Sequence, residues 1–191
     1  MSPRTSKQFE KIRNNSKQKI MRSALELFAR NGVMSTSVSD ITGNAGVSKG
    51  LLYNYYENKD ALIKELILSG MKRMTMDFDF DYGEKLTKER FEQLINKYFE
   101  LLENDTEYWK LYLSIITQPA VTDLVKEEII KMLSPFLKAV SQYYKDKNEK
   151  SPEAGAWLIG AILDGVSLDY MFDRKHYPVQ EIKEIIIKKL L

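Results

Sequence analysis

The sequence predicts an all-α protein in which a small N-terminal helical domain precedes a larger helical domain. Apolar residues recur at helical spacing along most of the 191 residues, helix start and stop signals separate these stretches, and no alternating strand pattern, repeat or low-complexity tract is present. We expect a flexible basic arm over residues 1–15, an N-terminal domain over 16–75 and a second domain over 76–191.

The first helix is predicted over residues 16–31. Ile20, Ala24, Leu27 and Phe28 fall on one face at helical spacing, and Gly32 follows where a helix end favours a residue without a Cβ atom. This face is expected to enter the core of the N-terminal domain.

Residues 37–59 predict two short helices joined by a tight turn. Ser37 and Asp40 have the spacing of a capping box, Gly46 suits a left-handed helix end, and Ser48 and Asn58 are N-cap candidates for the next two helices. Such a pair cannot bury a core alone, and its commonest use is to place one helix in the major groove of DNA. The alternative is an ordinary helical hairpin, because capping boxes occur in most helical proteins.

The rest of the chain also follows a helical pattern. Pro135 should kink or break one long stretch, and Ser151-Pro152 is a start signal with proline at the first helical position. The predicted helices cover residues 59–76, 87–103, 107–117, 121–147, 152–172 and 178–191.

The charge of the chain is unevenly distributed. The formal net charge is only +2, but residues 1–60 contain ten Lys and Arg against five Asp and Glu, and residues 1–22 contain seven cations against one carboxylate, Glu10. A basic front on a neutral-to-acidic body is typical of proteins that bind phosphate backbones, and such binding weakens with salt. The alternative is a solvated tail that only aids solubility.

Several other kinds of chemistry are not expected. The chain has no cysteine, which excludes disulfides and thiolate metal sites, and His176 is its only histidine. Asp77, Asp79 and Asp81 lack the glycine and glutamate of a calcium loop, and no phosphate-binding glycine loop or nucleophile elbow is present. We therefore predict no metal site, no cofactor and no enzyme. We also expect no membrane span and no secretory signal, and hence a cytoplasmic protein.

The residues from Lys17 to about Leu66 resemble the DNA-binding domain of the TetR family of bacterial transcription regulators. Five pieces match in the family's order, namely residues 20–32, Ser37-Val38-Ser39-Asp40-Ile41, residues 45–50, Leu52-Tyr53-Asn54-Tyr55-Tyr56 and Asn58-Lys59-Asp60-Ala61-Leu62. The resemblance covers about a quarter of the chain closely and the remainder only in its helical plan.

The resemblance implies a set of residues that contact double-stranded DNA. Lys49 could donate to guanine and Asn54 could pair with adenine, while Leu52 and Tyr56 belong to the core. Leu51 and Glu57 depart from the family's usual residues, which leaves the operator sequence open. The implied DNA-binding residues are Ser37, Ser39, Ser48, Lys49, Gly50, Leu51, Tyr53, Asn54, Tyr55 and Lys59.

For the second domain the resemblance implies ligand binding and homodimerisation. Small residues on the helix over 152–172 and apolar residues on the last helix would form a four-helix interface, unless they pack within the monomer. The interface candidates are Ala156, Gly160, Ala161, Gly165, Ile182 and Ile186. The candidates for an apolar or aromatic effector are Met71, Tyr98, Trp109 and Tyr112, although aromatic residues at this spacing are also typical of a core.

The function implied is a transcriptional regulator, by family habit a repressor, that binds a palindromic operator as a dimer and is released by a small molecule. Two alternatives remain open. One is a DNA-binding protein of the same fold without an inducer, and the other is a helical small-molecule-binding protein with no DNA role.

Overall fold

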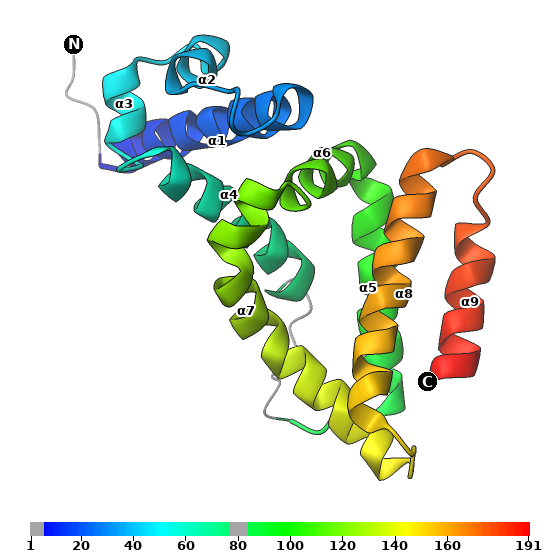
Figure 1. Ribbon diagram of the computed structural model, residues 1–191. Helices are drawn as coiled ribbons and strands as arrows, with labels where there is room; N and C mark the ends of the chain where they lie inside the picture. Colours follow the sequence, from blue (N-terminus) through cyan, green and yellow to red (C-terminus); the bar gives the residue numbers. More distant parts are fainter. Residues whose placement is uncertain (1–5, 77–83) are drawn as a thin grey trace. The chain divides into compact units, whose positions relative to one another are not determined.

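The computed structural model describes residues 6–76 and 84–191, so the Asp77–Gly83 segment considered above for calcium lies outside the described residues. Within these ranges every element is helical (Figure 1). The helices are α1 (Ser6–Asn31), α2 (Val38–Ala45), α3 (Lys49–Tyr53), α4 (Lys59–Met76), α5 (Lys88–Asn104), α6 (Thr106–Ile116), α7 (Pro119–Asp146), α8 (Pro152–Phe172) and α9 (Val179–Leu190).

The chain forms two compact units. Unit 1 comprises residues 1–70 together with 111–126, and unit 2 comprises residues 71–110 together with 127–191. The first part of unit 1 ends at residue 70, whereas the sequence predicts a domain boundary at 75. The inclusion of Leu111–Lys126 in unit 1 was not expected, because nothing in the sequence links that segment to the N-terminal helices.

The core of unit 1 is built from the predicted apolar faces. Ile20, Ala24 and Phe28 of α1 are fully buried, as are Ile41 of α2 and Leu52 of α3. Helices α1 and α2 make the most extensive contact between elements in this unit. The two short helices are therefore held by α1 and do not depend on their own propensity, which is too weak at this length.

Helix α1 begins at Ser6, ten residues earlier than expected. The segment expected to be a flexible arm is therefore helical from residue 6 onward. Its sequence has no apolar face to signal a helix, but Lys, Gln, Glu and Arg are all good helix formers that can extend a helix already nucleated by packing.

Unit 2 is organised around α5, α8 and α9, which lie side by side (Figure 1). The rings of Phe91 and Tyr143 meet edge to face with centroids 5.3 Å apart, which ties α5 to α7 in the same core. Helix α7 continues through Pro135, so of the two predicted effects of this proline the break is wrong and the kink stays a prediction. Ser151 makes no capping hydrogen bond, so proline at the first position is the start signal that α8 uses.

Helix α8 is, among the described helices, the one long and apolar enough to cross a membrane by length and composition. From the sequence we expect no membrane span, and this helix is not singled out as one. A buried face on α8, including Ile159, Leu163 and Val166, packs into the core of unit 2. Core helices of soluble proteins meet the same criterion, so the finding is weak evidence for a membrane segment.

Candidate nucleic-acid interface

The N-terminus of α2 is fixed by the predicted capping box. The Ser37 N–H donates to Oδ2 of Asp40 at 2.8 Å, the Ser37 hydroxyl donates to the same oxygen at 2.6 Å, and the Asp40 N–H donates to Ser37 Oγ at 3.2 Å. The Ser37 hydroxyl holds the pKa of the Asp40 carboxyl below its usual range, since these bonds favour the charged form. The only hydroxyl proton of Ser37 is thus used within the cap, while Ser39 is exposed and able to donate.

The turn between α2 and α3 also follows the sequence signals. Gly46 has a φ of +65°, in the left-handed region that favours glycine, and Val47 N–H closes the turn by donating to Thr42 O at 3.0 Å. Ser48 caps α3 by accepting from Leu51 N–H at 3.2 Å. The turn and the cap together set the direction in which α3 leaves α2.

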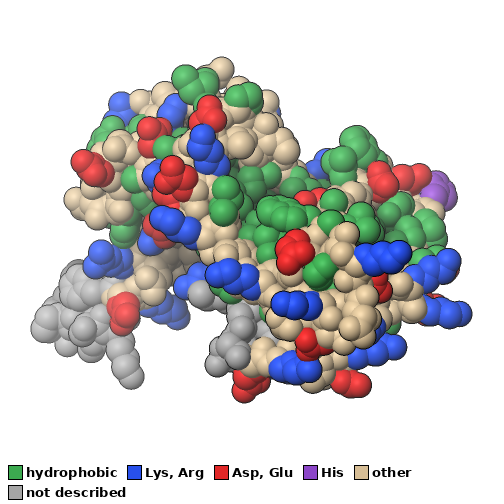
Figure 2. Space-filling view, turned by 60° about the horizontal axis from the view of Figure 1, so that its bottom comes forward, with side chains coloured by type: hydrophobic (Ala, Val, Ile, Leu, Met, Phe, Trp, Pro, Cys, Tyr) green, Lys and Arg blue, Asp and Glu red, His purple; other side chains and the backbone are tan. Residues whose placement is uncertain are grey.

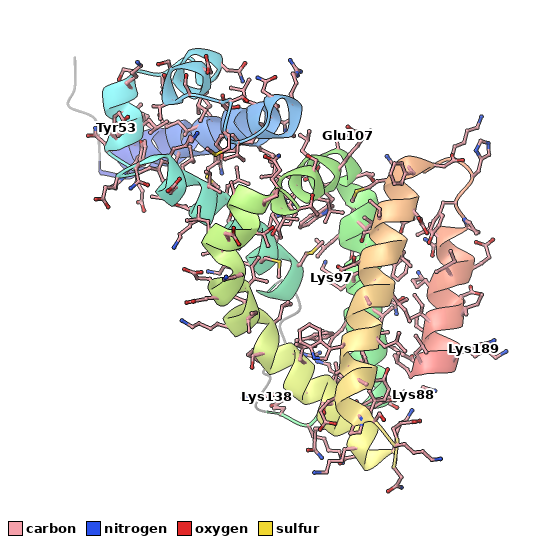
Figure 3. The ribbon with its side chains drawn as sticks, viewed as in Figure 1. Tyr53, Lys88, Lys97, Glu107, Lys138 and Lys189 are labelled. Atoms are coloured by element: carbon pink, nitrogen blue, oxygen red, sulfur yellow. The ribbon has the colours of Figure 1, made fainter. Side chains whose placement is uncertain are left out.

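One side of α3 is buried and the other is free. Leu52 and Tyr56 point into the core of unit 1, as predicted, while Leu51 is half-buried. Tyr53, labelled in Figure 3, leaves 53% of its surface exposed. The exposed residues of this segment are Ser48, Lys49, Gly50, Tyr53 and Asn54. They bring together an ammonium group, a side-chain amide, hydroxyls and a glycine backbone, which are groups suited to base edges and phosphates.

Lys59 is placed differently from the expectation of a simple phosphate contact. Its Nζ donates to the backbone carbonyls of Val33 at 2.9 Å and Thr36 at 3.1 Å. Two of its three ammonium protons therefore tie the start of α4 to the loop between α1 and α2. A phosphate contact by Lys59 stays a prediction and would have to use the third proton.

Tyr55 contacts the N-terminal part of α1. Its hydroxyl donates to the backbone carbonyl of Arg13 at 3.1 Å, and the Arg13 guanidinium carbon lies 5.8 Å from the centroid of the Tyr55 ring. Arg13 was missed in the sequence as an individual residue, because it lay in a segment expected to be a flexible arm. The cluster of cations in residues 1–22 was the only signal that could have indicated it.

The four effector candidates are buried, and the polar groups of three of them, Tyr98, Trp109 and Tyr112, bond to protein atoms. Met71, Tyr98 and Trp109 lie in unit 2, and Tyr112 lies in unit 1. Tyr98 donates to Leu163 O at 3.0 Å and also bonds Ser167, and burial raises its pKa. Trp109 Nε1 donates to Leu101 O and the Tyr112 hydroxyl donates to Ile67 O, both at 2.9 Å. The structure does not bring the four side chains together in one unit.

The interface candidates of α8 and α9 fall on both sides of these helices. Ala156 and Ile186 are buried in the core of unit 2, Gly160 and Ile182 are half-buried, and Ala161 and Gly165 are exposed. An exposed set of large apolar side chains, which the sequence reasoning missed, lies on the same two helices. This apolar face consists of Trp157, Leu158, Leu168, Phe172 and Ile185.

Figure 2 shows apolar side chains gathered next to the histidine, His176, which follows α8 in the chain. Phe172 is the most exposed member of the apolar face, with 81% of its surface free. A face of this kind is typical of a protein–protein contact.

Comparison with known proteins finds similarity over the same part of the chain. The sequence model of the family described as "Bacterial regulatory proteins, tetR family" matches residues 20–66. The chain is 35% identical over 100 residues to the fatty acid metabolism regulator protein of Bacillus subtilis, and the match covers 52% of this chain and 49% of that protein. The chain thus spans about half the length of that relative.

Two further similarities extend over more of the chain. It is 26% identical over 156 residues to the transcriptional regulator QacR of Staphylococcus aureus, covering 78% of this chain and 77% of that one. The structure of FadR from Bacillus subtilis in complex with stearoyl-CoA is similar with a TM-score of 0.72 at 23% identity, covering 91% of this chain and 96% of that chain. At that identity the second similarity concerns the fold alone.

Proposed function

We propose that the chain is a transcriptional regulator of the TetR family, which binds a palindromic operator as a dimer and is released by a small molecule; the match of that family's sequence model to residues 20–66 supports this. The observation that carries the proposal is the capped α2–turn–α3 unit with the exposed side of α3 facing solvent. The relatives are named as regulators, which supports a role in transcription and not in catalysis. A regulator that binds DNA would act in the cytoplasm, and we propose that location for this protein.

We assign recognition of the DNA base sequence to the exposed residues of α3 and to its C-cap. Lys49 can donate to guanine O6 or N7, Asn54 can pair with N6 and N7 of adenine, and Gly50 lets the backbone approach the base edges. A side chain at Gly50 would meet no atom of the protein closer than 4.0 Å, so its small size is not required by the fold. Instead, the absence of a side chain at this position would allow the backbone to approach DNA closely.

The test is selection of random duplex DNA by the purified protein, followed by binding measurements on the enriched site. A two-fold symmetric sequence is expected, and Asn54→Ala should relax the preference at one base position of each half-site. Lys189→Ala, at the C-terminal end of α9 (Figure 3), removes a charge outside unit 1 and should bind like the wild type. Failure of the wild-type protein to enrich any sequence would refute the proposal.

Dimerisation is assigned to α8 and α9. Trp157, Leu168 and Phe172 recur on α8 at spacings of eleven and four residues, which places them on one face, and Ala161 lies on the same face. Large apolar side chains beside small ones allow a second pair of helices to approach closely. Two-fold symmetry would present two copies of α3 to successive major grooves on one face of the DNA.

For the effector we propose a ligand with a long apolar chain, with an acyl-CoA as the first candidate. The support comes from two comparisons with Bacillus subtilis proteins, a sequence relative named as a fatty acid metabolism regulator and a structure of FadR determined with stearoyl-CoA. A ligand that prefers the conformation unable to bind DNA shifts the population by its differential affinity for the two conformations. Stearoyl-CoA should therefore release the protein from its selected duplex, whereas coenzyme A alone should not.

A specific observation favours the alternative of a regulator without an inducer. The polar groups of Tyr98, Trp109 and Tyr112 are all bonded to protein atoms in the core, as they would be in a domain that binds no ligand. The same titration separates the two proposals. Release of DNA by stearoyl-CoA supports the ligand-responsive regulator. Operator binding that no acyl-CoA of any chain length alters supports the alternative.

A further inference from the structure

The N-terminal part of α1 is a basic helix that extends past the core of unit 1. We call residues 6–22 of α1 the basic segment. Apart from Ile20, its described residues are exposed or half-buried, and Arg13 is among the exposed ones. Because so little apolar surface is buried here, the hydrophobic effect contributes little to holding the basic segment against the rest of unit 1. Other contacts must hold it in place.

Two tyrosines next to α3 hold two successive turns of the basic segment. The Tyr55 hydroxyl donates to Arg13 O at 3.1 Å, and the Arg13 guanidinium carbon lies 5.8 Å from the Tyr55 ring centroid. One turn later, Lys17 Nζ lies 5.8 Å from the centroid of the Tyr56 ring and pairs with Glu65 at 2.5 Å. Arg13 and Lys17 are four residues apart, so they lie on the same face of the helix.

This arrangement sets the basic segment beside the recognition surface. Tyr55 follows directly after Asn54, the exposed C-cap of α3. The contact with Tyr55 therefore holds Arg13 next to the residues that face the DNA bases. Cations over aromatic rings are attracted to the ring face, which restricts the guanidinium to this location and lowers the entropy lost when it binds a ligand.

The charge of Arg13 has no carboxylate partner among the described side chains. Lys17 is paired with Glu65 and Arg22 with Glu26, but no ion pair involves Arg13 within the described part of unit 1. An exposed, pre-positioned guanidinium without a counter-charge, at the edge of a DNA-reading surface, has the geometry and charge to bind a phosphate group.

We propose that Arg13 is a further DNA-contacting residue that binds a backbone phosphate beside the groove entered by α3, and that Tyr55 is a positioning residue that acts through Arg13. This inference rests on the proposed function and adds a contact outside the helix-turn-helix. It also changes the role of Tyr55, whose hydroxyl proton bonds Arg13 and is not free for a phosphate.

The test uses the full-length protein and its selected duplex at a series of KCl concentrations. Arg13→Ala should weaken binding to specific and non-specific duplexes alike, and should lower the slope of log K against log salt by about 0.9, the value for one lost phosphate contact. Lys189→Ala carries the same charge change on α9 and should keep the wild-type slope. An unchanged affinity and slope for Arg13→Ala would overturn the proposal.

The positioning role of Tyr55 is tested by a double-mutant cycle. Tyr55→Phe alone should weaken binding, but it should have little further effect in the Arg13→Ala protein, because its effect passes through Arg13. Additive effects would show that Tyr55 contacts DNA by itself and would overturn this part of the inference. Circular dichroism and thermal unfolding of each variant establish that unit 1 remains folded.

The two proposals fail in different ways. If Arg13 makes no contact, the wild-type protein still selects a symmetric site and Asn54→Ala still relaxes its preference, so only the inference is lost. If the wild-type protein binds no duplex at all, the proposed function and the inference are both refuted.

Discussion

The side chain of Gln118 holds the backbone of Val33, which lies 85 positions earlier in the chain. Gln118 Oε1 accepts from the Val33 N–H at 2.9 Å, while Nε2 donates to the carbonyl of Phe28 at 3.2 Å. The Val33 carbonyl in turn accepts from Lys59 at 2.9 Å. Both backbone polar groups of Val33 are thus satisfied by side chains from other elements, and this fixes the loop that leads into α2.

The first prediction concerns the hydrogen bonds of Gln118 to Val33 and Phe28. Gln118→Leu should destabilise the protein by about 1–3 kcal/mol, because it leaves the Val33 N–H without a partner in a partly buried site and removes one of the two donors to the Phe28 carbonyl, the other being the Gly32 N–H. Gln118→Glu can still accept from Val33 but cannot donate to Phe28, so it should lie between the wild type and Gln118→Leu. Urea unfolding measures the difference in the free energy of unfolding. Equal stability of all three proteins would contradict a stabilising role for these hydrogen bonds.

We predict that Lys59 stabilises the fold of unit 1, in addition to any contact with a phosphate. Lys59→Met keeps the length of the side chain but loses both hydrogen bonds, and it should destabilise unit 1 by about 1–3 kcal/mol in the absence of DNA. The melting temperature without DNA is the deciding measurement. A phosphate-binding residue with no structural role would instead lower DNA affinity and leave the melting temperature unchanged.

Gly70 is predicted to tolerate no larger residue. A Cβ atom at this position would lie 2.2 Å from Cε2 of Tyr112, whose hydroxyl is fixed to the carbonyl of Ile67. Gly70→Ala should therefore cost about 1–3 kcal/mol of stability through overpacking. Gly43→Ala in α2 is the matched control, since a Cβ there would meet no atom within 4 Å, and it should raise stability by up to about 1 kcal/mol through helix propensity. Similar effects of the two substitutions would contradict the assignment of close packing at Gly70.

The apolar face of α8 is predicted to be the dimer contact. Trp157→Glu and Phe172→Glu should each shift the protein toward the monomer, because a charge would be buried without a partner. Ile130→Glu on α7 is the control, as Ile130 is an exposed apolar residue outside the proposed interface. Sedimentation velocity gives the fraction of dimer, and a monomeric wild-type protein or unchanged variants would rule out this face.

A pH dependence is expected from the capping box of α2. The pKa of Asp40 is lowered in the folded protein by the Ser37 hydroxyl and N–H, so the charged carboxylate stabilises the fold above the unfolded pKa of about 3.9. This stabilisation is lost as the pH falls through the lower, folded-state pKa. Wild type should therefore be more stable than Asp40→Asn at pH 5–8, with the advantage shrinking below about pH 4.

The measurement is the urea midpoint at several pH values. Ser37→Ala serves as the control, because it removes one of the two groups of Ser37 that bond the carboxylate and should reduce the pH-dependent difference. A stability advantage that persisted unchanged to pH 2 would show that the cap does not depend on the charge of Asp40.

Much of the helix-turn-helix in unit 1 could be predicted because its signals are local. The capping box of Ser37, the left-handed Gly46, the cap of Ser48 and the burial of Leu52 each depend on a few neighbouring residues, and all four predictions are confirmed. Such features require only the backbone conformation and the side chains within one or two turns. The all-helical fold follows from the same kind of periodic signal.

The tertiary structure decided the features that join distant parts of the chain. The sequence contains no sign that Arg13 would meet Tyr55, that Gln118 would hold Val33, or that residues 111–126 would join the N-terminal helices. It also could not tell which side of α8 is buried, because small and large apolar residues surround the whole helix. Periodicity finds a face only when polar residues mark its opposite side, and long-range hydrogen bonds leave no periodic trace in the sequence. Local propensity therefore determined the elements, and packing determined which of their side chains are free to act.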